Sequence, residues 1–150
     1  MKVRDVMKKE VYTVHPESTL KEVVMMLLKY QVSGLIVIDD NKKVTGVVSE
    51  KDIYRILYPS YSDFYDSPAI YTDFKKQEEE IKNKSNIVVS EFMTKDVIST
   101  GPDEYIMKVG AIMLAHNIHR LPVINKQGKL VGVITRGLIY HNLFKKKLDL

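Results

Sequence analysis

Apolar residues recur in this chain with two different periods. From residue 20 onward, five apolar positions follow the spacing i, i+3, i+4, i+7, i+8: Leu20, Val23, Val24, Leu27 and Leu28. This spacing predicts a helix with one apolar face. Two short apolar runs follow, LIVI (35–38) and KVTGVV (43–48), with the polar turn DDNK between them. Short apolar runs on either side of a polar turn predict a pair of β-strands.

Two further segments complete the first pattern. The β-rich piece VYTV (11–14) precedes Pro16 and the helix, and a second helix is predicted from Ser49 through about Leu57. The order β-α-β-β-α then recurs 86 residues later without a gap, from Val3/Val89 to Ile53/Ile139. An internal repeat of this length indicates two copies of one structural unit.

The second copy fills the same positions with similar residues. Its strand piece is VIST (97–100), its strands are LPVI and KLVGVI, and its last helix is predicted from Thr135 through about Phe144. Glycines inside the third strand of each copy, Gly46 and Gly132, indicate close approach of another backbone. The helix positions equivalent to those of the first copy are Ile106, Val109, Gly110, Met113 and Leu114.

The fold class predicted is therefore α/β (α+β), with two repeats. A unit of about 50 residues leaves one sheet face uncovered, so we expect the two repeats to pack through their sheets with pseudo-two-fold symmetry and a cleft at each end. The expected boundaries are 1–57 for the first repeat, 58–87 for an inserted connection and 88–150 for the second repeat. Within the connection, YPSYSDFYDSP predicts a loop lying on the body and AIYTDFKKQEEEIKNK an amphipathic helix.

Composition and charge narrow the class of protein. Hydrophobic content of 45% and charged content of 28% are ordinary for a globular protein. No apolar run reaches the roughly 18 residues of a membrane span, no secretory signal begins the chain, and cysteine is absent, so a cytoplasmic location is expected. The formal net charge of +4 permits anionic partners without requiring nucleic acid.

The stretch GVVSEKD (46–52) admits two interpretations. Ser49 and Asp52 have the spacing of a capping box, in which the acid binds back to the first amide of the helix. The same side chains also suit a nucleotide, since a carboxylate can accept from two neighbouring hydroxyls and a hydroxyl at a helix N-terminus suits phosphate. The second copy, GVITRGL, keeps the hydroxyl of Thr135 but has Leu138 in place of the acid.

The chain resembles a tandem pair of CBS domains (cystathionine-β-synthase domains, a Bateman module). The resemblance rests on VMKKEVYTVHPESTLKEV, GLIVIDDNKKVTGVVSEKDI and the second copy from FMTKDVIST to LVGVIT, and covers nearly the whole chain. It implies a regulatory module without catalysis of its own. Such modules bind AMP, ADP or ATP, sometimes S-adenosylmethionine or a dinucleotide such as NAD, and they commonly form homodimers that act on another protein.

The resemblance also implies roles for individual residues in one cleft. Asp52 would accept from both ribose hydroxyls, Ser49 would contact phosphate, and Arg120 would clamp phosphate beside His119. The alternative for His119 and Arg120 is a surface pair at a strand edge, and Lys95 is equally well explained as a surface charge. The adenine would lie among Val47, Lys95, Asp96, Val97, Ile98 and Ile118.

The symmetry-related cleft keeps few of these groups. Ser33 and Gly34 stand where the second copy has His119 and Arg120, so the second cleft retains only Tyr12, Thr135 and Arg136. No catalytic motif occurs, and His116 and His119 lack a third metal ligand, so neither an enzyme nor a metal site is expected. An adenine-nucleotide sensor is thus the leading hypothesis. The alternatives are a structural or protein-interaction module with a vestigial cleft, or a nucleic-acid-binding accessory protein.

Overall fold

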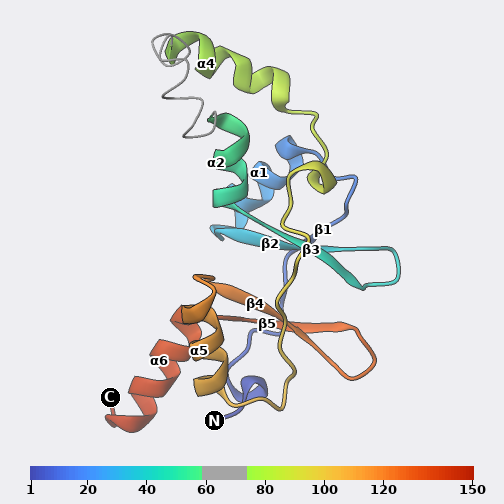
Figure 1. The fold of residues 1–150 in the computed structure, drawn as a ribbon. Helices are drawn as coiled ribbons and strands as arrows, with labels where there is room; N and C mark the ends of the chain where they lie inside the picture. Colours follow the sequence, from blue (N-terminus) through green and yellow to red (C-terminus); the bar gives the residue numbers. More distant parts are fainter. Residues whose placement is uncertain (59–73) are drawn as a thin grey trace. The chain divides into compact units, whose positions relative to one another are not determined.

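The computed structural model describes residues 1–58 and 74–150, and the elements follow the order predicted from sequence, except that the second repeat lacks its first strand (Figure 1). The α+β class and the two repeats are thereby confirmed. In the first repeat the elements are β1 (Thr13–Val14), α1 (Leu20–Tyr30), β2 (Gly34–Ile38), β3 (Val44–Ser49) and α2 (Glu50–Leu57). In the second repeat they are α5 (Ile106–Ala115), β4 (Arg120–Ile124), β5 (Leu130–Thr135) and α6 (Arg136–Lys147).

The helix ends follow local signals. Thr19 caps α1 through the capping box with Glu22, and α2 begins directly after Ser49, as predicted. Helix α6 continues three residues past the predicted end at Phe144. Residues 74–84 of the segment predicted as an amphipathic helix form α4 (Phe74–Glu80) followed by the 3-10 helix η3 (Ile81–Lys84), and none of their side chains is buried. The predicted Tyr-rich loop lies outside the described residues, except for its first residue.

The sheets of the two repeats are related but unequal. Strand β1 pairs in parallel with β2, placing Val14 opposite Val37, and β3 is the other neighbour of β2. Strands β4 and β5 are antiparallel. In the second repeat the counterpart of β1 is reduced to one parallel bridge between Thr100 and Val123, positions 86 residues after Val14 and Val37. Only Thr100 of the predicted strand VIST is therefore paired.

Each compact unit combines most of one repeat with the leading segment of the other. The first-repeat unit comprises residues 13–39 and 45–95, and the second-repeat unit comprises residues 1–12, 40–44 and 96–150. The short 3-10 helices η1 (Val3–Asp5) and η4 (Val89–Glu91) begin these leading segments. The amide of Val3 donates to the carbonyl of Glu104 at 2.9 Å, and the amide of Val89 donates to the carbonyl of Ser18 at 2.7 Å. The two repeats thus exchange equivalent segments.

The cores of the two units use equivalent positions. In Figure 1, α1 and α2 lie on one face of the first-repeat sheet, and α5 and α6 lie on one face of β4–β5. Leu28 and Leu114 fall on the predicted apolar faces, yet 74% and 75% of their surfaces are exposed. The buried side chains of the first-repeat unit include Leu20, Val23, Leu27, Leu35, Val37, Val48 and Val89. Those of the second-repeat unit include Val3, Val6, Ile106, Val109, Met113, Leu121, Val123 and Ile134.

The strand glycines allow the exchanged segments to approach closely. A Cβ at Gly46 would lie 2.5 Å from Met93 Sδ, and a Cβ at Gly132 would lie 2.9 Å from the carbonyl oxygen of Lys8. Both distances are shorter than side-chain contacts normally allow. The predicted close backbone approach at these glycines is confirmed, and the approaching chain in each case is the leading segment of the other repeat.

Candidate functional site

Asp52 is a buried carboxylate at the start of α2. Strand β3 runs into the helix without a loop, because Ser49 ends the strand and is also the N-cap residue. Asp52 then occupies the third helical position, where its side chain can turn back toward the amide of Ser49. Only 3% of the residue is exposed. A buried carboxylate needs hydrogen-bond donors around it, and the local structure supplies them.

Four donors surround the two oxygens of Asp52. Oδ2 accepts from the amide of Ser49 at 2.9 Å and from Ser49 Oγ at 3.3 Å. Oδ1 accepts from Thr94 Oγ1 at 3.0 Å and from a guanidinium nitrogen of Arg55 at 3.3 Å. The capping interpretation of Asp52 is therefore confirmed. The carboxylate also forms a polar cluster with residues beyond the cap, and we call these four residues, Ser49, Asp52, Arg55 and Thr94, the Asp52 cluster.

Thr94 reaches this cluster through the exchanged leading segment. Its amide donates to the carbonyl of Val47 at 2.9 Å, and the amide of Val47 donates back to the carbonyl of Thr94 at 3.0 Å. Lys95 follows and is exposed. The first-repeat unit thus contains four of the predicted site residues, Val47, Ser49, Asp52 and Lys95, and the bridge to Thr94 ties Lys95 to the strand that carries Val47.

Sequence reasoning missed two members of the Asp52 cluster. Arg55 had a local signal, because an acid and a base three residues apart on a helix lie on neighbouring positions of its surface. Thr94 had none, since it is 42 residues from Asp52 in the chain. Only the exchange of segments brings it to the carboxylate.

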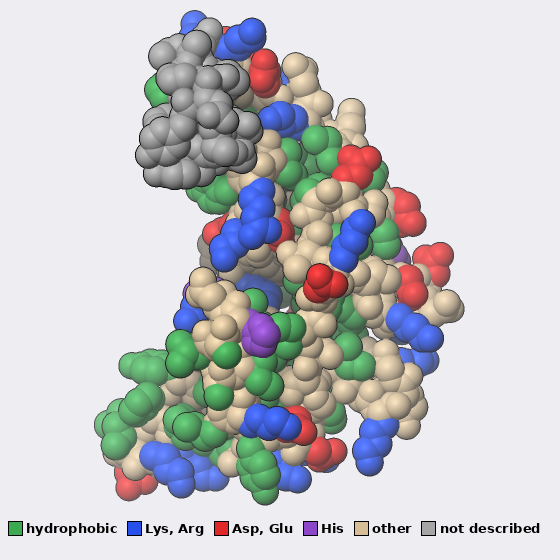
Figure 2. All heavy atoms as spheres, viewed as in Figure 1, with side chains coloured by type: hydrophobic (Ala, Val, Ile, Leu, Met, Phe, Trp, Pro, Cys, Tyr) green, Lys and Arg blue, Asp and Glu red, His purple; other side chains and the backbone are tan. Residues whose placement is uncertain are grey.

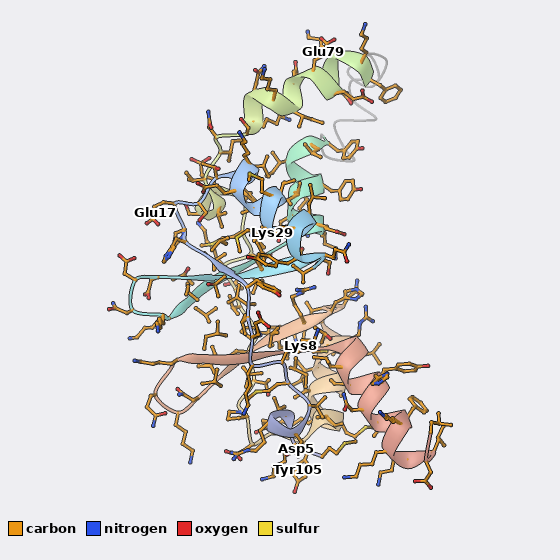
Figure 3. The ribbon with its side chains drawn as sticks, turned by 180° about the vertical axis from the view of Figure 1, so that it is seen from behind. Asp5, Lys8, Glu17, Lys29, Glu79 and Tyr105 are labelled. Carbon is orange, nitrogen blue, oxygen red and sulfur yellow. The ribbon has the colours of Figure 1, made fainter. Side chains whose placement is uncertain are left out.

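The second repeat lacks the carboxylate, the threonine and the arginine of the Asp52 cluster at the equivalent positions. The counterparts of Asp52, Thr94 and Arg55 are Leu138, Lys8 and His141, each offset by 86 residues. Lys8, labelled in Figure 3, pairs through its backbone with Val133 of β5. The cap itself survives, because the amide of Leu138 donates to Thr135 Oγ1 at 3.2 Å. The second repeat therefore keeps the helix start without a carboxylate.

Basic side chains gather where β4 begins and α6 starts. The strand register places Arg120 opposite Thr135. The amide of Arg136 donates to the carbonyl of His119 at 3.0 Å, and a guanidinium nitrogen of Arg136 lies 2.6 Å and 2.5 Å from Nδ1 and Nε2 of that histidine. These four residues adjoin within one unit, although the sequence analysis assigned them to two different clefts.

The remaining predicted residues also belong to the second-repeat unit. Ile98 and Ile118 are half-buried and pack against its core. Val97 and Tyr12 are half-buried, and Asp96 is exposed. Within residues 1–58 and 74–150, no group of three or more His, Asp or Glu side chains is placed to hold a metal ion. No helix in that part of the chain is long and apolar enough to span a membrane.

Comparison with known proteins identifies the repeats. The sequence profile of the CBS domain matches residues 3–59 and again residues 89–144. The chain belongs to the CBS domain family. The recognition of a CBS-domain pair from its repeated motifs is confirmed.

Relatives of this CBS pair differ widely in length. An uncharacterised protein of Methanocaldococcus jannaschii is 33% identical over 149 residues, covering 91% of this chain and 88% of that protein. Inosine-5'-monophosphate dehydrogenase of Aquifex aeolicus is 30% identical over 124 residues, covering 82% of this chain. The match is only 20% of that enzyme's length.

A solved structure of a CBS pair is also similar. The crystal structure of CBSX2 in complex with AMP superposes with a TM-score of 0.74, covering 97% of this chain and 98% of that chain, at 27% sequence identity. CBSX2 is a CBS-pair protein from Arabidopsis thaliana. The architecture of the present chain is therefore that of a CBS pair.

Proposed function

We propose that this CBS pair is a regulatory module that binds one adenine ribonucleotide, AMP, ADP or ATP, in one cleft between its repeats. Binding would change the conformation or the dimer and so control an unidentified partner protein. The observation that carries the proposal is the buried carboxylate of Asp52, present in one repeat and replaced by Leu138 in the other. The complex of CBSX2 with AMP supports an adenine ligand.

The chemistry of the proposed site follows from the groups at hand. The two oxygens of Asp52 suit the vicinal hydroxyls of a ribose, and Ser49 lies at a helix N-terminus, where phosphate is favoured. His119 and Arg120 would receive the phosphates, with Arg120 offering a planar pair of donors. The adenine would pack among Val47, Ile118 and the segment 95–98, where the backbone of Val97 and Ile98 would read its edge.

The second-repeat unit is more basic than the first-repeat unit, which favours binding of the ligand's phosphates by the second-repeat unit. That unit contains 14 lysines and arginines against seven aspartates and glutamates. The first-repeat unit contains nine against 12. A basic surface attracts a phosphorylated ligand and orients its approach. This distribution agrees with a ribose bound by Asp52 and phosphates bound by His119 and Arg120.

Calorimetry with AMP, ADP, ATP, S-adenosylmethionine and NAD tests the proposal. We expect saturable binding of at least one adenine nucleotide, at one ligand per chain, because only one repeat keeps the carboxylate. Two equivalent sites per chain would contradict the asymmetric assignment. Absence of binding to all five compounds would contradict the function.

A structural or protein-interaction module is the second candidate. The Asp52 carboxylate already accepts from four donors within the protein, and a purely structural cap would look the same. Thermal unfolding separates the two candidates. A ligand that binds only the folded state raises the unfolding temperature, whereas a vestigial cleft leaves it unchanged at millimolar nucleotide.

Arg120→Ala should weaken ATP binding more than adenosine binding. The guanidinium would contact phosphate and not the nucleoside, so we expect a loss of about fivefold for ATP and little change for adenosine, by calorimetry. Lys126→Ala removes a charge from an exposed turn of the same unit and serves as the control for net charge. Equal losses for ATP and adenosine would show that Arg120 does not clamp phosphate.

Exposed apolar side chains support the proposed homodimer. Tyr54 stacks on Tyr58 with ring centroids 5.8 Å apart, and the equivalent Tyr140 and Phe144 lie 5.0 Å apart. Figure 2 shows hydrophobic side chains gathered over α5 and α6. The same exposed positions recur in both units, as Leu28 and Leu114 also do. Such a repeated pattern suits a self-complementary contact between two copies.

Leu114→Ser should weaken the dimer. Because Leu114 is three-quarters exposed, the change leaves the core of the unit intact and removes apolar surface from the proposed contact. We expect the dimer dissociation constant to rise about fivefold in sedimentation equilibrium. Lys21→Ser, at an exposed position of α1, is the control. If Leu114→Ser and Lys21→Ser behave alike, the contact lies elsewhere.

A further inference from the structure

The four hydrogen bonds of Asp52 form two classes. Each carboxylate oxygen has one short bond, to the amide of Ser49 at 2.9 Å or to Thr94 Oγ1 at 3.0 Å. Each also has one longer bond of 3.3 Å, to Ser49 Oγ or to Arg55. A carboxylate offers about four acceptor positions. All of them are occupied, so a ribose can bind Asp52 only by replacing donors.

The short bonds come from groups whose backbone is held beside the carboxylate. The amide of Ser49 belongs to the backbone at the start of α2, and Thr94 is held on β3 by its two backbone bonds to Val47. The amide of Ser49 cannot leave without breaking the strand-to-helix junction, and the backbone bridge keeps the Thr94 hydroxyl beside Oδ1. These two bonds orient the carboxylate.

The longer bonds come from groups that can move. Ser49 Oγ turns about a single side-chain torsion. The side chain of Arg55 is 67% exposed, and its guanidinium can point into water instead. Withdrawing these two donors frees one acceptor position on Oδ1 and one on Oδ2, which matches the two hydroxyls of a ribose.

We propose that Arg55 occupies the position on Asp52 Oδ1 that a ribose hydroxyl takes, and that it is therefore an internal competitor of the nucleoside. This inference rests on the proposed function. A vicinal diol displaces Arg55 from Oδ1 and Ser49 Oγ from Oδ2, while the amide of Ser49 and Thr94 keep the carboxylate in place. The displaced Ser49 hydroxyl is then free to donate to a phosphate oxygen.

Removing the competitor should tighten binding of a ligand without phosphate. Adenosine is the probe, because a displaced Arg55 gains no phosphate contact from it. Arg55→Met keeps the aliphatic length and removes the donors. We expect adenosine to bind roughly twofold to fivefold more tightly to this variant by calorimetry. This range corresponds to the loss of one weak ion pair with an exposed arginine.

Two controls isolate the effect. Lys51→Met removes one positive charge from the same helix at an exposed position and should leave adenosine affinity unchanged. Binding of 2',3'-dideoxyadenosine, which lacks both hydroxyls, should be equal in the wild type and in Arg55→Met. A general change in charge or fold would instead move both ligands together.

Salt gives a second measurement on the unmodified protein. The Arg55 side chain is 67% exposed although Asp52 is buried, so raising NaCl from about 50 mM to about 500 mM partly screens their attraction. Wild-type affinity for adenosine should therefore rise slightly, while Arg55→Met should show no such rise. Unchanged or weaker adenosine binding in Arg55→Met would overturn the inference and leave the nucleotide site standing. Failure of the wild type to bind adenosine and AMP at all would overturn both.

Discussion

Asp52→Ala lowers the affinity for AMP at least tenfold if the carboxylate holds the ribose. The variant removes both acceptors for the vicinal hydroxyls, and a hydrogen bond to a charged group contributes about 1.5–3 kcal/mol. Calorimetry measures the loss directly. The loss should shrink for 2',3'-dideoxyadenosine 5'-monophosphate, which has no hydroxyls to offer. Equal affinity of the wild type and the variant for AMP would contradict the ribose assignment.

The structure adds a stability cost to this variant. Asp52 accepts from the amide of Ser49 and from Thr94, so alanine removes both of these partly buried hydrogen bonds. Loss of a helix cap costs about 0.5–2 kcal/mol. Asp52→Asn is the better matched variant, because its amide keeps the size of the side chain and one acceptor oxygen. It should fold more stably than Asp52→Ala in thermal unfolding and still bind AMP weakly.

The elements were predictable because their signals are local, and the repeat was predictable because the same signals recur 86 residues later. The i, i+3, i+4 spacing around Val23 and the paired apolar runs on either side of DDNK act over a few residues, and the structure follows them. The same patterns do not indicate which apolar positions become covered. Leu28 belongs to the periodic stripe of α1 as clearly as Leu27, yet it is exposed while Leu27 is buried.

The candidate site also contains a part that the sequence predicts and a part that it does not. The pair Ser49 and Asp52 is visible in seven residues of sequence, and the structure shows the capping contact that the spacing predicts. Thr94 was not predictable, because the two leading segments resemble each other. Val3 matches Val89 and Met7 matches Met93, so apolar pattern alone does not tell which segment packs on which sheet. Long-range packing decides which leading segment joins which sheet, and this in turn decides which residues surround Asp52.

The exchange of leading segments makes the N-terminal residues part of the second-repeat unit. Val3 is fully buried in that unit, and Val6 nearly so. Lys8 exchanges two backbone bonds with Val133, at 3.0 Å and 2.9 Å. Burial of a valine side chain contributes about 1.5–3 kcal/mol, so the segment supplies several kcal/mol of a total that is about 5–15 kcal/mol for a typical domain.

A chain beginning at Lys9 should therefore lose structure far from its new terminus. We expect the free energy of unfolding to fall by several kcal/mol in urea, and amide protection to disappear first at Val133 and along α5. Protection in α1 and β2 should outlast it, although these elements follow the deletion in sequence. Val89→Ala is the mirror control, because it should weaken α1 before α5. If the deletion instead opened α1 and β2 first, each repeat would hold its own leading segment, and Thr94 could not be the residue that orients Asp52.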